Sequence, residues 1–129
     1  MTPRTVLIVD DDEDIVESFQ LLLEDEGWQV YTAYSSSQAL EIIRTVDVDL
    51  ALLDFMLLGM KGDELAFELR KVSPELCILL VTGYSDYSKN ALQIDELVNQ
   101  VLIKPVRDKV LLEKINECRM LKTEKMKRN

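Results

Sequence analysis

Histidine is absent from this 129-residue sequence. The chain therefore has no histidine nucleophile, histidine general base or histidine zinc ligand. Cysteine is scarce, and its two positions, Cys77 and Cys118, fall in a predicted buried strand and a predicted helix. We therefore expect no disulfide framework, and a reducing, cytoplasmic location.

Long apolar runs and an excess of positive charge are missing as well. No signal sequence and no apolar run of about 18 residues is visible, so neither export nor a membrane span is expected. With 47% hydrophobic and 30% charged residues, 4 Gly and 3 Pro, the composition is that of a globular domain rather than a disordered chain. The net charge of -9 argues against direct binding of nucleic acid. The length suits one domain with one core.

Four apolar runs end in polar side chains that can take part in phosphate or metal chemistry. A carboxylate at the end of a buried strand is costly unless it lies at an open rim. In an open parallel sheet, ligands bind in the crevice beyond the carboxyl ends of the strands. The sequence therefore predicts one site built from four strand ends, with Asp54 at its centre. Val6 to Val9 precedes Asp10, Asp11 and Asp12; Val48 to Leu53 precedes Asp54; Cys77 to Val81 precedes Thr82; and Val101 to Ile103 precedes Lys104.

Apolar residues at helical spacing follow each of these runs and also a more mixed strand from Trp28 to Tyr34. Five strands thus alternate with five helices, which predicts a parallel sheet covered by helices on both faces. The helix from about Asp86 to Leu97 has the weakest apolar pattern. We expect one domain over residues 1–121, and a basic tail or the start of a linker at 122–129.

The acidic run at 10–14 has two other interpretations. A calcium loop would need Gly at its sixth position and Glu at its twelfth, where this chain has Ile15 and Leu21, so it is excluded. Acids that complement a helix dipole account for the last three residues of the run. Asp10 and Asp11 differ, because they lie at the strand end and would face the same rim as Asp54.

Carboxylates gathered in one crevice resist ionisation unless a cation neutralises them. Mg²⁺ is the economical cation, because its small octahedral shell takes a few carboxylates, a carbonyl and waters. A phosphatase of the haloacid dehalogenase type would also use a strand-end Asp, but it needs a second Asp two residues later. That position here is Met56.

Thr82 and Lys104 each have an ordinary alternative. Thr82 could be β-branched strand filler, but Gly83 follows it at the rim, where its hydroxyl can reach a ligand. Lys104 could be a surface lysine, but Pro105 fixes a turn after it, and a lysine that faces acids is often functional. We therefore include both in the predicted site.

In these residues the chain resembles the receiver domain of two-component response regulators, from Thr5 to about Leu121. Each matching piece alone is weak, but their order and spacing together are specific. The resemblance implies a flavodoxin-like α/β fold, a doubly wound five-stranded parallel sheet with strand order 2-1-3-4-5. The matching pieces are Ile8-Val9-Asp10-Asp11, Leu53-Asp54 followed by Met60 and Gly62, Val81-Thr82-Gly83, and Lys104-Pro105.

The resemblance also implies a phosphorylation-controlled signalling switch. Asp54 would accept a phosphoryl group from a phosphohistidine of a sensor kinase, and Thr82 and Lys104 would contact phosphoryl oxygens. The missing histidine fits, because the donor must then be another protein, a histidine kinase or a phosphotransfer protein of a phosphorelay. The Lys104-Pro105 peptide is expected to be cis. The implied Mg²⁺ ligands are Asp10, largely through water, Asp11, the Asp54 carboxylate and the Met56 carbonyl.

Three positions depart from the pattern of the family. Leu58 stands where Pro is usual and Lys61 where Asp is usual, so the loop after the phosphoacceptor is expected to differ in shape. Val101 replaces the usual aromatic switch residue, and Tyr84 or Tyr87 is expected to stand in for that ring.

We expect the readout to be a partner or a homodimer bound through the fourth helix, the fifth strand and the fifth helix. Direct nucleic-acid or membrane binding is not expected. The chain would be mainly a regulatory domain that catalyses its own phosphorylation and slow dephosphorylation. The alternative is a pseudo-receiver, an interaction module that keeps the fold without accepting phosphate. The acidic pair with Asp54, Thr82 and Lys104 argues against it.

Overall fold

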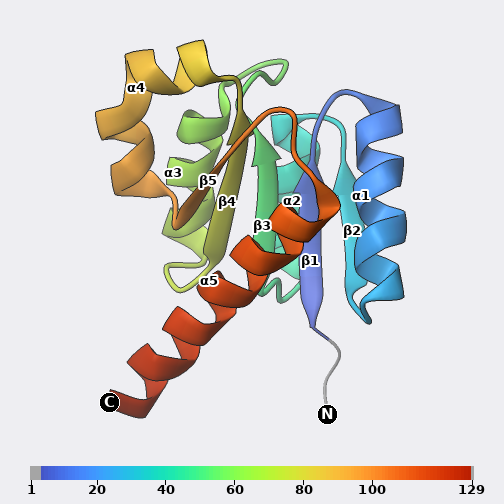
Figure 1. Cartoon of the computed structure of the whole chain (residues 1–129), viewed down its shortest axis with the longest axis vertical. Helices are drawn as coiled ribbons and strands as arrows, with labels where there is room; N and C mark the ends of the chain where they lie inside the picture. The colour runs from blue at the N-terminus through green and yellow to red at the C-terminus, as the bar shows by residue number, and fades with distance from the viewer. Residues whose placement is uncertain (1–3, 129) are drawn as a thin grey trace.

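The structure, a computed structural model, describes residues 4–128, with side chains described for residues 4–120. Five strands alternate with five helices along the chain (Figure 1). The elements are β1 Thr5–Val9, α1 Glu13–Asp25, β2 Gln29–Ala33, α2 Ser36–Thr45, β3 Leu50–Asp54, α3 Gly62–Val72, β4 Cys77–Thr82, α4 Tyr84–Leu97, β5 Gln100–Ile103 and α5 Asp108–Arg128.

All neighbouring strands are parallel, and their order is β2-β1-β3-β4-β5, as predicted. The central strand β3 is buried on both faces, because Leu50 to Leu53 are each no more than 1% exposed. Fully burying one such Leu side chain contributes about 1.5–3 kcal/mol. The apolar run that ends at Asp54 is therefore what holds that carboxylate at the edge of the sheet.

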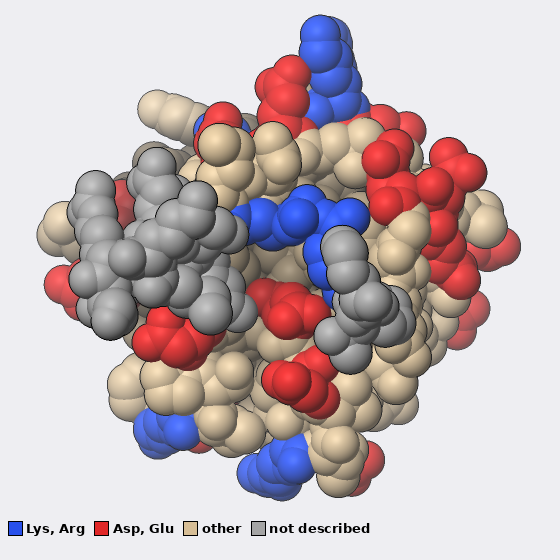
Figure 2. Space-filling model, turned by 90° about the horizontal axis from the view of Figure 1, so that it is seen from below, with Lys and Arg blue, Asp and Glu red and all other residues tan. Residues whose placement is uncertain are grey.

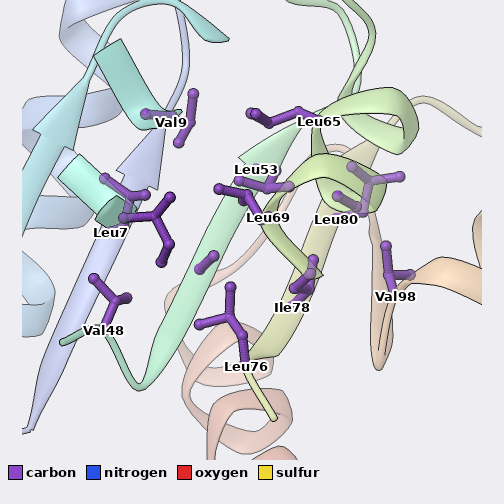
Figure 3. Packing of buried hydrophobic residues seen from close by; sticks show 14 of the residues in the cluster. Leu7, Val9, Val48, Leu53, Leu65, Leu69, Leu76, Ile78, Leu80 and Val98 are labelled. Carbon is purple, nitrogen blue, oxygen red and sulfur yellow. The ribbon is translucent and has the colours of Figure 1, made fainter. Parts of the chain in front are cut away.

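The core lies in two layers, one on each face of the sheet. On one face α2, α3 and α4 pack against the sheet, and on the other face α1 and α5 do. Figure 3 shows the first layer, in which Leu65 and Leu69 of α3 lie against Leu53 and Leu80 of the sheet. Successive β3 residues point to opposite layers, since Leu53 belongs to the first and Leu52 to the second.

Side-chain caps and one glycine mark the ends of α1 and α2. The Asp12 side chain accepts hydrogen bonds from the Asp14 amide at 3.0 Å and the Ile15 amide at 3.4 Å, and so caps α1. Ser35 caps α2 by accepting from the Gln38 amide at 3.3 Å. Gly27, at φ 93°, supplies the left-handed turn after α1.

Helix α4 is longer than predicted and is not continuous. It begins at Tyr84, two residues before the predicted start, and Asn90 inside it has non-helical angles of φ -126° and ψ 15°. The Asn90 side-chain amide donates to the Asp86 carbonyl at 2.8 Å. The weak apolar pattern of this segment thus corresponds to two short helical pieces joined at Asn90.

The expectation of no disulfide is wrong for this structure. Cys77 at the start of β4 and Cys118 in α5 are joined, 41 residues apart in sequence. Both lie in the layer between the sheet and α5, where they are 4% and 1% exposed. The spacing of the two cysteines in the sequence does not reveal that the start of β4 and a turn of α5 face each other. Because the two cysteines are joined, their scarcity no longer supports a reducing compartment.

Helix α5 continues well past its last contacts with the sheet (Figure 1). Among its described side chains, which end at Met120, the buried positions are Leu111, Ile115 and Cys118. The predicted boundary at residue 121 and the basic side chains beyond it lie outside the described side chains. Within residues 4–128, no helix is both long and apolar enough to cross a bilayer.

Candidate functional site

Four strand ends meet at one edge of the sheet. The Asp54 Cα pairs with Val81 and the Thr82 Cα with Ile103, so β3, β4 and β5 end side by side. The strands are held in this register beyond their ends, because the Phe55 amide donates to the Val81 carbonyl and the Lys104 amide to the Thr82 carbonyl, each at 2.9 Å. The polar residues predicted to form one site therefore do lie at one edge.

Three carboxylates converge at this edge. One oxygen each of Asp10, Asp11 and Asp54 lies within 4.8 Å of the other two. Asp10 and Asp54 are each only 5% exposed, whereas Asp11 is exposed to solvent. Such a group of hard oxygen ligands, two buried and one facing water, suits a divalent cation that keeps several waters.

The electrostatics of Asp10 reflect this crowding. Burial raises the pKa of Asp10 to about 6, and repulsion from Asp54 and Asp11 acts in the same direction. The Asp12 amide, which donates to Asp10 Oδ1 at 2.9 Å, and the Lys104 charge oppose the rise in pKa without cancelling it. The edge therefore holds more negative charge than the surrounding residues neutralise.

Lys104 supplies the main cation of the site. Its ammonium lies 2.8 Å from Asp54 Oδ1, and its side chain is 42% exposed. Burial alone would lower the pKa of Lys104, but the contact with Asp54 and the charges of Asp10 and Asp11 outweigh it and raise the pKa above its usual value. The lysine thus stays charged and faces the acids, as predicted.

The Asp54 carboxylate is incompletely satisfied by the described residues. Its Oδ1 is fully shielded from solvent, and its contact with Lys104 is an ion pair without the alignment of a hydrogen bond. A buried charged oxygen that lacks a hydrogen bond is costly. Together with the three converging carboxylates, this orphan oxygen fits a site that receives a cation.

Thr82 and Met56 flank the carboxylates. Thr82 is 1% exposed, and its hydroxyl donates a weak local hydrogen bond to the Gly83 carbonyl at 3.2 Å. Rotation of the Thr82 side chain can direct this hydroxyl to another acceptor. The Met56 side chain is 55% exposed, two residues after Asp54. The cis peptide expected between Lys104 and Pro105 is confirmed.

The loop after Asp54 depends on Gly62. The Gly62 amide donates to the Phe55 carbonyl at 2.7 Å. A Cβ at this position would lie 2.5 Å from the Asp54 carbonyl oxygen and 2.7 Å from Leu80 Cδ1, so only glycine fits. Leu58 and Lys61 are the two residues of this loop that depart from the family pattern. Leu58 is 69% exposed, and the Lys61 ammonium lies 5.8 Å from the centre of the Phe55 ring.

The sequence did not reveal an apolar hollow of about 570 Å³ directly beside Lys104. It lies between the start of α1 and the segment after β5, and no single run of residues encodes it. Its lining residues are Asp14, Ile15, Ser18, Phe19, Val81, Lys104, Pro105 and Val106.

A second hollow lies near the amino ends of β1 and β2, away from the carboxylates. Arg4 and Arg119 lie over the Trp28 ring at 5.1 and 5.9 Å, with Glu26 and Glu113 among the lining residues. Figure 2 looks at this end of the molecule and shows basic and acidic groups side by side. The mixture of signs gives it no clear preference for an anion or a cation.

Comparisons with known proteins agree with this geometry. A profile of the response regulator receiver domain family matches residues 6–116. A CheY-like response regulator receiver domain protein from Methanospirillum hungatei is 32% identical, with 96% of this chain and 99% of that chain covered and a TM-score of 0.89. A receiver domain protein from Clostridium thermocellum is 28% identical, with 89% and 93% covered and a TM-score of 0.82.

The response regulator protein TrrA from Thermotoga maritima, solved in complex with Mg²⁺ and BeF, is 30% identical, with 89% of this chain and 98% of that chain covered and a TM-score of 0.81. The family profile spans most of the chain and includes all four polar strand ends. This chain belongs to the response regulator receiver domain family.

Proposed function

We propose that this chain is a phosphorylation-controlled switch in which Asp54 accepts a phosphoryl group from a phosphohistidine of a histidine kinase or phosphotransfer protein. The observation that carries the proposal is the buried Asp54 carboxylate, which lies 2.8 Å from the Lys104 ammonium and beside the acidic pair Asp10 and Asp11. A carboxylate placed between a fixed cation and a cation-binding cluster is suited to attack a charged phosphoryl group.

The transfer requires little of the protein beyond positioning and neutralisation of charge. An Asp54 oxygen bonds to phosphorus while the phosphorus–nitrogen bond of the donor breaks, and the imidazole of the donor keeps the electron pair. Lys104 offsets the charge on one phosphoryl oxygen. The Thr82 hydroxyl turns from the Gly83 carbonyl and donates to another.

Asp10, Asp11 and Asp54, with the Met56 carbonyl, are the residues that would hold Mg²⁺. The ion would neutralise charge on the phosphoryl oxygens during transfer. The raised pKa of Asp10 supports this assignment, because a carboxyl group that resists ionisation in the free protein gains most from a nearby divalent cation.

The donor would approach through the apolar hollow beside Lys104. Phe19 and Val106 line it together with Lys104, whose ammonium lies 2.8 Å from the acceptor. An apolar surface at the mouth of a charged site lets a partner exclude water while its histidine reaches Asp54.

The readout would pass through α4 to the surface that α4 shares with β5 and α5. The Gly83 carbonyl accepts both the Thr82 hydroxyl at 3.2 Å and the Tyr87 amide at 3.0 Å, so a turn of Thr82 acts on the first bond of α4. Exposed apolar side chains on this surface, Ile103 at 38% and Val110 at 40%, support a phosphorylation-dependent homodimer or partner complex there.

Dephosphorylation would be slow. A water must be placed in line to hydrolyse the aspartyl phosphate, and polar side chains usually help to place it. Met56 and Tyr84, 55% and 71% exposed, offer an apolar group and a bulky ring instead.

We also propose a cytoplasmic location and a domain that ends near residue 121, both of which rest on family membership.

The test is intact mass spectrometry after incubation with a small-molecule phosphodonor and Mg²⁺. We expect one added phosphoryl group, absent when EDTA replaces Mg²⁺ during the incubation and absent in Asp54→Asn. Asp47→Asn, which changes an exposed acid on the α2–β3 loop, is the matched control and should be phosphorylated like the unmodified chain. Equal uptake by Asp54→Asn would refute the assignment, and no uptake by the unmodified chain would favour the pseudo-receiver.

A further inference from the structure

A groove between α3 and α4 lies apart from the carboxylate cluster. It has a volume of about 450 Å³, and Met60, Phe67 and Leu97 supply its apolar lining. Acidic residues, Asp63, Glu64 and Glu68, line it along α3. The groove therefore combines an apolar lining with acids along one helix, and Gln93 of α4 adds a polar group.

The dipole of α3 accounts for only part of this composition. Phe67 is 50% exposed, although its neighbours Ala66 and Leu65 are completely buried. Acids in the first turn, Asp63 and Glu64, complement the positive end of the helix. Glu68 lies beyond that turn, where the dipole gives an acid no such advantage. The exposed ring offers a bound partner an apolar contact at this groove.

Lys71 shows how the groove accommodates a cation. Its ammonium lies 4.5 Å from the centre of the Phe67 ring and 3.2 Å from Glu68 Oε1. A basic side chain of this protein thus already lies over the aromatic ring and beside an acid at one end of the groove. The other two acids, Asp63 and Glu64, form no ion pair among the described residues.

The groove is also held at a fixed width. Arg70 of α3 donates from Nε to the Leu97 carbonyl at 2.7 Å and from Nη2 to Asn99 Oδ1 at 2.6 Å. The same guanidinium donates to the Leu76 carbonyl at 3.0 Å. A groove whose two helices are tied together loses little freedom when a ligand binds, which favours affinity.

We propose that this groove binds an amphipathic helix of a partner protein, one that carries Lys or Arg on either side of an apolar stripe. The stripe would contact Met60, Phe67 and Leu97, and the cations would pair with Asp63 and Glu64. An apolar groove between two helices suits a helix whose contacts recur at i, i+3, i+4 and i+7. The acids select a basic partner over a neutral or acidic one. The inference is independent of phosphoryl transfer at Asp54.

The probe is a fluorescent Leu/Lys peptide with helical periodicity, compared with a peptide of the same composition in scrambled order. Binding is followed by anisotropy, and its location by chemical-shift changes in the ¹⁵N-labelled chain. We expect the periodic peptide to bind more tightly than the scrambled one, with shifts concentrated at Met60, in α3 and in the second half of α4.

Two groove variants, Phe67→Ala and the double variant Asp63→Asn/Glu64→Gln, should each weaken binding about tenfold. The matched control lies on α1, where Leu21 is 64% exposed and Glu17 and Glu24 are exposed acids. Leu21→Ala and Glu17→Gln/Glu24→Gln should leave binding unchanged. Equal binding of the scrambled peptide, shifts centred on α1, or equal losses in the control variants would overturn the proposal.

Discussion

Asp10 illustrates how the fold changes the chemistry of a single side chain. Its carboxyl group ends an apolar strand, is 5% exposed and faces two other acids. The resulting pKa of about 6 means that folding without a cation opposes ionisation of Asp10. Because the folded pKa lies above the ordinary value of 3.8, stability falls as pH rises between about 4 and 6.

We therefore predict that Asp10→Asn stabilises the metal-free protein at pH 7. The gain should be roughly 1–3 kcal/mol, since two pKa units correspond to about 3 kcal/mol, and it should vanish below about pH 4. Asn keeps an acceptor for the Asp12 amide. Urea unfolding in EDTA across this pH range measures it, with Asp11→Asn, at an exposed neighbour, as the comparison. A gain that does not change with pH would contradict the explanation.

The loop beside Asp54 requires glycine at position 62. Gly62→Ala would place a methyl group 2.5 Å from the Asp54 carbonyl oxygen, and we expect a loss of about 1–3 kcal/mol in the free energy of unfolding. Gly83→Ala is the control, because nothing lies within 4 Å of a Cβ there and φ is -73°. Gly83→Ala should change the free energy of unfolding by less than about 1 kcal/mol, because the loss from a weaker N-cap is offset by the gain from a less flexible unfolded chain. Equal losses would show that crowding is not the cause.

Helix α4 is where the sequence pattern and the structure differ most among the helices. The weak apolar spacing of this segment did not predict the break at Asn90. It also did not reveal that the Tyr87 hydroxyl donates to both Asp95 oxygens, at 2.9 and 3.1 Å, across that break. Hydrogen bonding to Asp95 raises the pKa of Tyr87. Tyr87 and Val101 both pack against the same core layer, which favours Tyr87 as the ring that replaces the missing aromatic residue.

Tyr87→Phe should loosen the second half of α4, because the ring keeps its packing and only the hydrogen bonds to Asp95 are lost. We expect faster amide hydrogen exchange from Ala91 to Leu97, with no comparable change in β3 or α1. Tyr84→Phe removes the hydroxyl of a ring that is 71% exposed, and it should leave exchange unaltered. Unchanged exchange in Tyr87→Phe would mean that the bonds to Asp95 do not connect the two pieces of α4.

The response of α4 to the switch can be tested with beryllofluoride and Mg²⁺ in place of the phosphoryl group. If Thr82 turns toward Asp54, the Gly83 carbonyl loses one donor, and exchange should change from Gly83 to Leu97. Changes confined to the loop from Phe55 to Gly62 would contradict this route. Asp54→Asn, which cannot form the mimic, should show neither change.

The bond between Cys77 and Cys118 joins the sheet to α5, which connects two parts of the molecule that are distant in sequence. The closed segment spans 41 residues and includes β4, α4, β5 and half of α5. Chain entropy alone predicts about 4 kcal/mol of stabilisation for a loop of this length, and measured values for disulfides are typically 2–4 kcal/mol.

Equilibrium unfolding with and without reductant should therefore differ by about 2–4 kcal/mol. Cys118→Ala cannot form the bond, and its stability should not respond to reductant. Alkylation under denaturing, non-reducing conditions gives an independent count of free thiols. Two reactive thiols in the oxidised preparation, or an equal response of both proteins to reductant, would contradict the role assigned to this bond.

Much of the architecture follows from local signals. Apolar runs that stop at Asp10, Asp54, Thr82 and Lys104 predicted both the strands and the edge at which their side chains meet, because parallel strands end together. Features that join distant segments could not be predicted in this way. The Cys77–Cys118 bond, the hollow beside Lys104 and the α3–α4 groove depend on how helices lie on the sheet, and no periodicity within one segment encodes that arrangement.

We propose that the phosphoryl acceptor is Asp54 rather than one of the acids around it. An aspartyl phosphate is reduced by borohydride to homoserine, whereas an unmodified aspartate is not, so peptide mapping after phosphorylation and reduction identifies the acceptor directly. We predict homoserine at position 54, dependent on Mg²⁺ and on the phosphodonor, with Asp10 and Asp11 recovered unchanged. Homoserine at position 10 or 11, or at no position in a chain whose mass shows an added phosphoryl group, would contradict the account.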